Sequence, residues 1–416
     1  MIPWQSHQIV RKAVTAFHVI NVVIVLVVLV SFLLKRERPR WPFLIPMYVY
    51  FVGSVLGMFA SEAFAENLYT LAQDIYLYVW FALLCVLLDR KERIALLALT
   101  WALMLLVVVS SEGVVPGVTG SNRLEFTFRN PNRAAAYLTF SFFILYHPAI
   151  PWLLKLPLAF VTFTAVSTTG SSAGYIGLGM GIAASVGVFL YMSTPRHFRP
   201  LYPLGLIALA LLAASSTWWV GKDMVSIVEE FTPSGADERV ERSATTRQEI
   251  WSVGLETFKE HPLGIGPASF HKQIESGFGS KGTIELHSDF VAALVERGIV
   301  GFIGFLLLIL WVVVAIIRLL NVTAEHGDRG DKVWSAGISG ACAAYYFYSI
   351  THEALHHETF WLMLALLVSQ LAIMIRQSRE RLWMADEEPL EAFEGEAVLA
   401  GGGWRQRRGW RQSLSQ

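Results

Sequence analysis

Long apolar runs constrain this chain of 416 residues more than any other feature of its sequence. About 20 mostly apolar residues cross the ~30 Å hydrocarbon core of a bilayer as a helix. Such runs lie near 14–34, 42–60, 70–88, 94–110, 133–148, 152–168, 173–192, 201–220, 299–320, 334–351 and 359–376. In lipid every backbone N–H and C=O group needs a partner within its own segment, so the runs predict helices. We expect an all-α, polytopic integral membrane protein of about 11–12 transmembrane helices with a large helical outer loop.

The composition excludes several classes of protein. Hydrophobic residues make up 54% of the chain and charged residues only 16%, against about 25% charge in a typical soluble protein. The 33 basic residues balance the 33 acidic ones, so no overall positive field would attract nucleic acid. The two cysteines, Cys85 and Cys342, both lie in apolar runs, where they are expected to act as small buried side chains.

The basic residues also predict an orientation. Lys and Arg are enriched in the loops that face the cytoplasm. The basic segments are 35–40, 89–93, 196–199 and 376–381. The segments expected on the outer side are 61–69, 111–132, 169–173, 221–298 and 352–358. The N-terminus fits less well, because an odd number of spans would place the basic pair Arg11 and Lys12 outside.

This orientation divides the chain into four parts. They are N-terminal transmembrane helices (1–220), a large outer loop (221–298), C-terminal transmembrane helices (299–376) and a flexible cytoplasmic tail (377–416). Loops as long as the outer one are uncommon in compact proteins and are often functional. We therefore look for catalytic groups in the outer loop first.

The first helix expected in the outer loop starts near Arg247. Thr246 and Glu249 form a capping-box pattern, and Trp251, Leu255 and Phe258 follow at helical spacing. Arg247 would then lie in the first turn, where free N–H groups and the helix dipole favour anions. A guanidinium at that position indicates a phosphate or pyrophosphate site, although a surface arginine on an amphipathic helix would show the same pattern.

A second helix is expected to begin after His287. Ser288 is a suitable N-cap and Gly298 a suitable stop. The positive end of a helix favours the neutral form of a nearby imidazole, and a neutral histidine can act as a general base. A histidine that only packs or caps remains the alternative.

The sequence resembles the O-antigen ligase family at several ordered segments. In the outer loop these are Arg247-x-x-x-Trp251, His261-Pro-Leu-Gly-Ile-Gly266, His287-Ser-Asp-Phe290 and Glu296-Arg-Gly-Ile-Val-Gly301. Upstream they are Gly120-Ser-Asn-Arg123-Leu and Phe128-Arg-Asn-Pro-Asn-Arg133-Ala. The chain departs from the family's pattern at Ser288, where Asn is common, and in the Ser-rich segment 167–174, which lacks the usual arginine.

The resemblance implies a membrane glycosyltransferase that uses a lipid-linked donor. It implies transfer of O-antigen polysaccharide from undecaprenyl pyrophosphate to lipid A-core at the periplasmic face of the bacterial inner membrane, with inversion and without a metal or other cofactor. The catalytic residues would be His287, acting as general base, and Arg247, binding the pyrophosphate. The substrate-binding candidates are Arg123, Arg129, Arg133, Asn130, Asn132, Asp289, His352 and His356. An O-antigen polymerase and a protein O-glycosyltransferase use the same donor and remain open.

A competing motif lies near the C-terminal end of the bundle. His352-Glu353-Ala-Leu-His356 matches the zinc protease pattern, in which two histidines share one face of a helix and the glutamate activates water. No further segment offers a third ligand, so we prefer a role as polar lining of the site. A transporter is a further alternative, but the polar groups gather in an outer loop rather than at mid-membrane.

Overall fold

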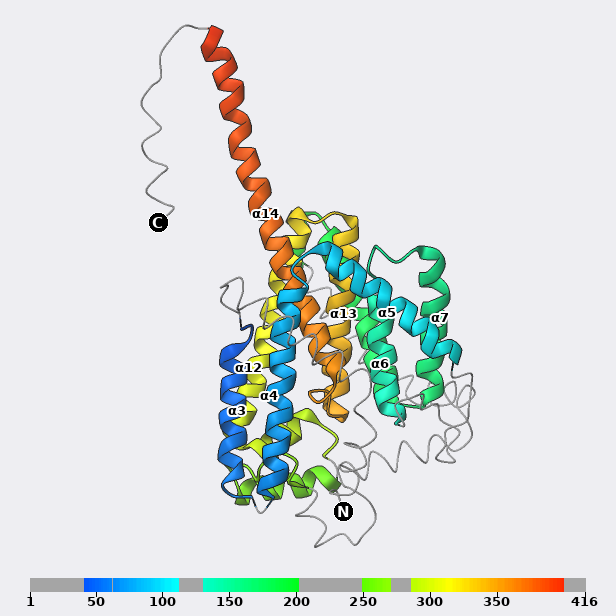
Figure 1. The fold of residues 1–416 in the computed structure, drawn as a ribbon, viewed down its shortest axis with the longest axis vertical. Helices are drawn as coiled ribbons and strands as arrows, with labels where there is room; N and C mark the ends of the chain where they lie inside the picture. The colour runs from blue at the N-terminus through cyan, green and yellow to red at the C-terminus, as the bar shows by residue number, and fades with distance from the viewer. Residues whose placement is uncertain (1–40, 62, 112–129, 202–248, 271–285, 400–416) are drawn as a thin grey trace.

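The computed structural model describes residues 41–61, 63–111, 130–201, 249–270 and 286–399. Within these ranges the regular structure is entirely helical, which confirms the predicted all-α class (Figure 1). The long helices are α3 (Leu44–Met58), α4 (Phe64–Leu87), α5 (Lys91–Ser111), α6 (Pro131–Ile144), α7 (Trp152–Thr169), α8 (Ser172–Ser193), α12 (Asp289–His326), α13 (Arg329–Thr351) and α14 (Glu358–Leu399). A shorter helix covers 249–260, and the apolar runs predicted near 14–34 and 201–220 lie outside the described residues.

Several of these helices are long and apolar enough to cross a membrane. Five meet both criteria, namely Phe64–Leu87, Trp152–Thr169, Ala173–Ser193, Asp289–His326 and Glu358–Arg381. Large apolar side chains such as Phe160 (73% exposed) lie on their outer surfaces, where lipid rather than water would cover them. The chain is a polytopic helical membrane protein, as predicted.

Small residues allow two pairs of helices to pack closely, α3 with α12 and α8 with α13. A Cβ atom added to Gly53 on α3 would lie 2.2 Å from the backbone nitrogen of Gly301 on α12. A second close crossing joins α8 to α13, where the Ser185 hydroxyl donates a hydrogen bond to the carbonyl of Ala336 at 3.0 Å. Small residues at such crossings are typical of helix packing in membranes.

Helix α12 breaks at Gly298, where the sequence predicts a helix stop. Gly298 has φ 64°, and the break frees backbone groups on either side of it. The turn at 261–270 binds these groups: Gly266 N–H donates to the carbonyl of Glu296 at 2.9 Å, and Ile299 N–H donates to the carbonyl of Pro262 at 3.0 Å. The break therefore holds part of the outer loop against the bundle.

Charged contacts join the basic segments at one end of the bundle, which we call the basic end (residues 89–93, 196–201, 325–331 and 376–381). Lys91 pairs with Asp331 at 2.6 Å, and Arg199 donates to the carbonyl of Ala324 at 3.3 Å. The opposite end, which we call the polar end, contains residues 61–67, 130–133, 261–270, 286–289 and 352–357. The predicted cytoplasmic and outer segments within the described residues thus separate to opposite ends of the molecule.

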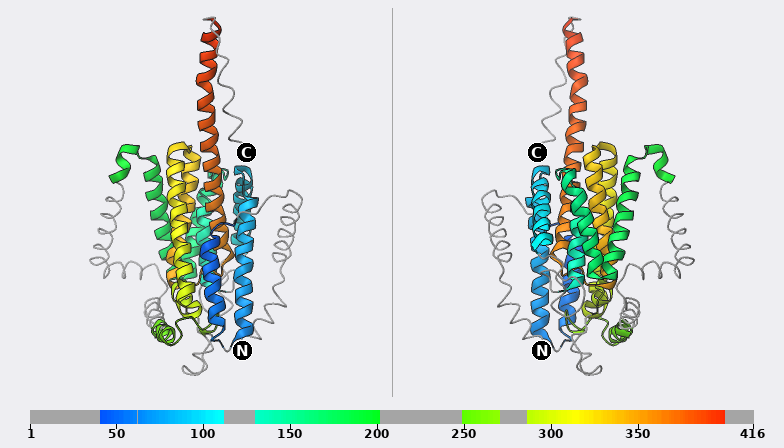
Figure 2. Two further views of the ribbon diagram at one scale, coloured as in Figure 1. Left: turned by 90° about the vertical axis from the view of Figure 1, so that its left-hand side faces the viewer. Right: turned by 90° about the vertical axis from the view of Figure 1, so that its right-hand side faces the viewer.

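Helix α14 continues past the basic end as a long extension (Figure 2). It is helical to Leu399, although the sequence predicts a flexible tail from 377. Residues 400–416 of that tail lie outside the described residues.

Candidate functional site

Three segments that are distant in the sequence meet at the polar end. They are the start of α6 (130–133), the start of α12 (286–289) and the link between α13 and α14 (352–357). These segments contain seven of the candidate residues predicted from the sequence, namely Asn130, Asn132, Arg133, His287, Asp289, His352 and His356. The site is therefore assembled by the fold, from residues that no local pattern would group.

His287 lies directly before the first turn of α12. Ser288 is the N-cap, as predicted, and its hydroxyl accepts a hydrogen bond from Val291 N–H at 3.5 Å. His287 itself has φ 50°, a left-handed conformation that is uncommon for a residue other than glycine. Strained backbone of this kind is concentrated at functional sites.

The ring of His287 lies near a second histidine. Its centroid is 6.1 Å from that of His352, the residue that directly follows α13. His352 is buried and stacks on Tyr348 at 4.8 Å, with an angle of 26° between the rings. The Tyr348 hydroxyl donates to the backbone carbonyl of Asn132 at 3.1 Å. These contacts connect the start of α12 to the start of α6.

The start of α6 combines a cap with an exposed positive charge. The side chain of Asn130 accepts hydrogen bonds from Asn132 N–H at 2.9 Å and Arg133 N–H at 3.3 Å, and Pro131 occupies the first turn. The Oδ1 atom of Asn130 therefore caps α6. The Arg133 side chain is exposed at the polar end, where it remains available to an anion.

His357 lies close enough to this arginine to interact with its charge. Burial lowers the pKa of His357 to about 3, and the positive charges of Arg133 and His356 act in the same direction. His357 is therefore neutral at physiological pH, and its ring lies 6.0 Å from that of Tyr348.

Asp289 has a different role from the one predicted. Its side chain is buried, and its two carboxylate oxygens accept hydrogen bonds from Ala354 N–H at 2.8 Å and Leu355 N–H at 3.4 Å. Asp289 thus fixes the link between α13 and α14, instead of presenting its carboxylate to a substrate.

The conformation of this link also tests the predicted zinc site at His352-Glu353-Ala-Leu-His356. Helix α13 ends at Thr351, and His352 has the extended angles φ −149° and ψ 163°. Since α14 starts only at Glu358, His352 and His356 do not share a helix face, which the protease arrangement requires. In the described part of the chain, no three His, Cys, Asp or Glu side chains form a group that could hold a metal ion. The metalloprotease interpretation is therefore wrong in its geometry.

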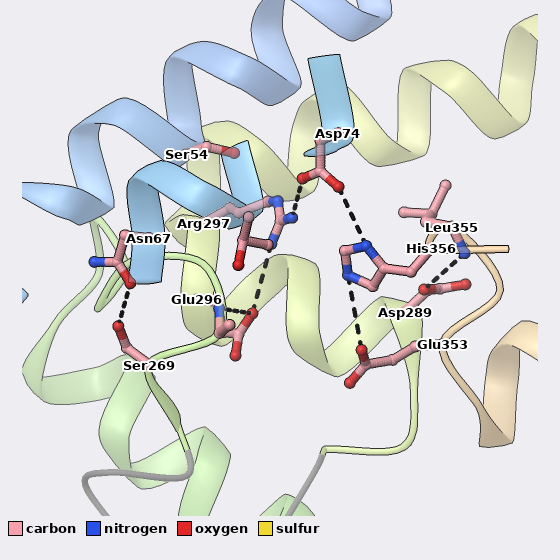
Figure 3. Close-up of polar contacts among 12 residues, drawn as sticks. Ser54, Asn67, Asp74, Ser269, Asp289, Glu296, Arg297, Glu353, Leu355 and His356 are labelled. Atoms are coloured by element: carbon pink, nitrogen blue, oxygen red, sulfur yellow. Dashed lines mark hydrogen bonds and ion pairs between the residues drawn. The ribbon is translucent and has the colours of Figure 1, made fainter. Parts of the chain in front are cut away.

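His356 instead joins a network of charged side chains that sequence analysis missed (Figure 3). Its Nδ1 atom lies 3.2 Å from Asp74 Oδ1, and its Nε2 atom lies 3.8 Å from Glu353 Oε2. Arg297 Nη2 donates to the other oxygen of Asp74 at 2.5 Å and Arg297 Nη1 lies 3.5 Å from Glu296. Burial alone would lower the pKa of His356, but the Asp74 and Glu353 carboxylates raise it to about 9, so His356 is charged at neutral pH. The sequence did contain a signal for this network, because Asp74 is a single charged residue in an apolar run and such residues usually have a function.

Other predicted residues remain without a structural position. Arg247, Arg123 and Arg129 lie outside the described residues. The helix expected after Arg247 is present over 249–260 and is fixed by Trp251, whose Nε1 donates to the carbonyl of Leu286 at 2.9 Å. Its buried face differs from the predicted one, because Ile250, Val253 and Phe258 pack inward while Leu255 is 44% exposed.

Comparison with known families places the centre of this site in a recognised domain. Residues 157–306 match the family model described as O-antigen ligase. This match supports membership of the O-antigen ligase family. The match covers α7 from residue 157, α8, the helix over 249–260, His287 and the start of α12. The segments 130–133 and 352–357 lie outside it. No curated protein matches the chain. The family supports an O-antigen ligase or polymerase type of function, a glycosyltransferase-like activity on polysaccharide and lipid substrates.

Proposed function

We propose that this protein is an O-antigen ligase that transfers polysaccharide from undecaprenyl pyrophosphate to lipid A-core. The reaction takes place at the polar end, which faces the periplasm, and the basic end faces the cytoplasm of a bacterial inner membrane. The orientation rests on the gathering of Lys91, Arg199, Arg376 and Arg381 at the basic end.

Arginines bind the leaving group of the donor. The pyrophosphate carries a concentrated negative charge, and a guanidinium forms paired, charge-assisted hydrogen bonds to such oxygens. Arg133 lies exposed at the polar end. In the sequence, Arg123 and Arg129 precede the segment 130–133, and Arg247 precedes the helix over 249–260. Positive charge at this position stabilises the charge that develops on the pyrophosphate, so the reaction needs no metal ion.

His287 removes a proton from the acceptor. As the acceptor hydroxyl oxygen attacks the anomeric carbon of the polysaccharide, its proton passes to the neutral imidazole. The bond from the anomeric carbon to the phosphate oxygen breaks, and undecaprenyl pyrophosphate leaves with the bonding electrons. A single displacement of this kind inverts the anomeric carbon.

One observation carries this proposal: the strained His287 precedes a helix start in the matched family domain and lies at the end of the bundle that presents Arg133. The helix N-terminus favours the neutral imidazole that a base requires. His352 lies beside His287, and Tyr348 stacks on His352, so the two side chains offer polar and aromatic lining for a sugar.

The test combines purified protein in detergent with an undecaprenyl-pyrophosphate-linked glycan and lipid A-core. The proposal predicts glycosylated lipid A-core with inverted anomeric configuration, formed equally well in excess EDTA. Longer lipid-linked glycan in the absence of lipid A-core would instead indicate a polymerase, and glycan on an added acceptor protein would indicate a protein glycosyltransferase. Transfer that EDTA abolishes and zinc restores would contradict the metal-free mechanism.

A further inference from the structure

The charged network at the polar end reaches into the membrane-spanning part of the bundle. Asp74 lies in the span Phe64–Leu87 and is 3% exposed, and Arg297 near the start of α12 is 1% exposed. The Arg297 guanidinium also covers the ring of Tyr50, 4.6 Å from its centroid. Charged groups are costly at such depth and are usually retained for a function.

The network ends in two different segments of the polar end (Figure 3). On one side Glu296 Oε2 accepts a hydrogen bond from Ala268 N–H at 2.9 Å, which binds the turn 261–270. On the other side Asp74 holds His356 at 3.2 Å, which binds the link 352–357. One buried ion pair, Asp74 with Arg297, therefore lies between the turn that follows the helix over 249–260 and the link that carries His352.

The link 352–357 has other anchors besides His356, because Ala354 and Leu355 are buried in the apolar core and Trp361 Nε1 donates to the carbonyl of Leu355 at 2.7 Å. Asp289 binds its backbone at Ala354 and Leu355, and Asp289 belongs to the same α12 start as His287. His356 is the side chain through which the buried ion pair reaches this link, so loss of its contact with Asp74 would loosen the segment that places His352 beside His287.

We propose that Asp74 and Arg297 are positioning residues, which act through His356 to hold the link 352–357, and with it His352, in register with His287. The expected effect on glycan transfer rests on the proposed function. The expected effect on the position of the link 352–357 does not depend on any activity. The pair connects the turn 261–270 to the link 352–357 through the interior of the bundle.

The pair must be removed as a unit to separate positioning from folding. Removal of one partner leaves an uncompensated buried charge and destabilises the protein, whereas removal of both charges is often tolerated. The test variant is therefore Asp74→Asn with Arg297→Gln, and Lys91→Gln is the matched control, because it breaks an ion pair of 2.6 Å at the basic end.

Three quantities are measured for each variant in detergent: the melting temperature, amide hydrogen exchange of the segment 352–357, and the rate of glycan transfer. In the double variant we expect a melting temperature within a few degrees of the control and about tenfold faster exchange at Ala354 and Leu355. We also expect kcat to fall by about 10- to 100-fold with little change in KM for the donor, because misplaced groups slow the reaction without loss of binding.

Exchange and kcat at the control values would overturn the inference. If the double variant does not fold, His356→Gln decides the question, because His356 is 27% exposed and its replacement leaves the Asp74–Arg297 pair intact. The same increase in exchange and decrease in kcat are expected, and their absence would overturn the inference. If the wild-type protein transfers no glycan, the proposed function fails, and hydrogen exchange alone still decides the inference.

Discussion

His287 and His352 lie with their ring centroids 6.1 Å apart, although one precedes α12 and the other directly follows α13. The fold therefore places a second imidazole beside the proposed base. This proximity gives the histidine-rich segment 352–357 a role as part of a glycan-transfer site, in place of the metal site that its sequence pattern indicates.

The neighbouring imidazole can be tested without disturbing the packing. His352→Phe keeps an aromatic ring against Tyr348, from which His352 is 4.8 Å, but removes both ring nitrogens. We expect transfer to fall about tenfold, the effect of losing one hydrogen bond to a sugar or to the base, with an unchanged melting temperature. Wild-type transfer by this variant would show that His352 only packs.

Arg133 is expected to act in donor binding. Its side chain is exposed, so Arg133→Gln should leave the melting temperature unchanged. Loss of a charge-assisted hydrogen bond of about 1.5–3 kcal/mol should raise KM for the lipid-linked donor by about tenfold or more. The control is Arg93→Gln, an exposed arginine paired with Asp89 at the basic end. An equal effect of the two substitutions would contradict a specific role for Arg133.

The charge on His356 should make stability depend on pH. Its pKa is about 9 in the folded protein, because Asp74 and Glu353 outweigh the effect of burial, and about 6.5 in an unfolded chain. Since the folded state binds the proton more tightly, this contribution is complete below about pH 6.5 and is lost as the pH rises to about 9. Thermal melting of the wild type should show this decrease, and His356→Gln should lack it. Identical pH profiles for the two proteins would contradict the ion pair.

The crossing of α3 with α12 should tolerate no side chain at Gly53. A Cβ atom there would lie 2.2 Å from the backbone of Gly301, so Gly53→Ala should destabilise the bundle by about 1–3 kcal/mol. Gly179 on α8 is the matched control, because a Cβ atom at that position meets no atom within 4 Å. Thermal melting of the two variants measures the difference, and equal melting temperatures would show that α3 does not pack as described.

Local signals in the sequence predicted the features that depend on neighbouring residues. The apolar runs predicted the helices, and the pattern at Ser288 and Gly298 predicted both the start and the break of α12. The family resemblance was confirmed through the matched domain, which contains His287.

The remaining features depend on contacts between distant segments. Nothing in the sequence indicates that Asp74 pairs with Arg297, because the bundle alone brings α4 and α12 together. The zinc pattern failed for a related reason. The motif lies in a non-helical link, whose backbone N–H groups at Ala354 and Leu355 are bound by the distant Asp289 carboxylate. Asp289 and Asn130 both proved to bind backbone N–H groups, a role that residue type alone does not distinguish from substrate binding.

The most direct test of the central claim compares two histidine variants in the transfer assay. His287→Gln removes the proposed base, and His326→Gln alters a histidine at the basic end, where Arg381 binds only its backbone carbonyl. Loss of a general base should lower kcat by about 10²- to 10⁴-fold, while the melting temperature and the activity of the control variant stay near those of the wild type. Transfer by folded His287→Gln at the wild-type rate would contradict the account.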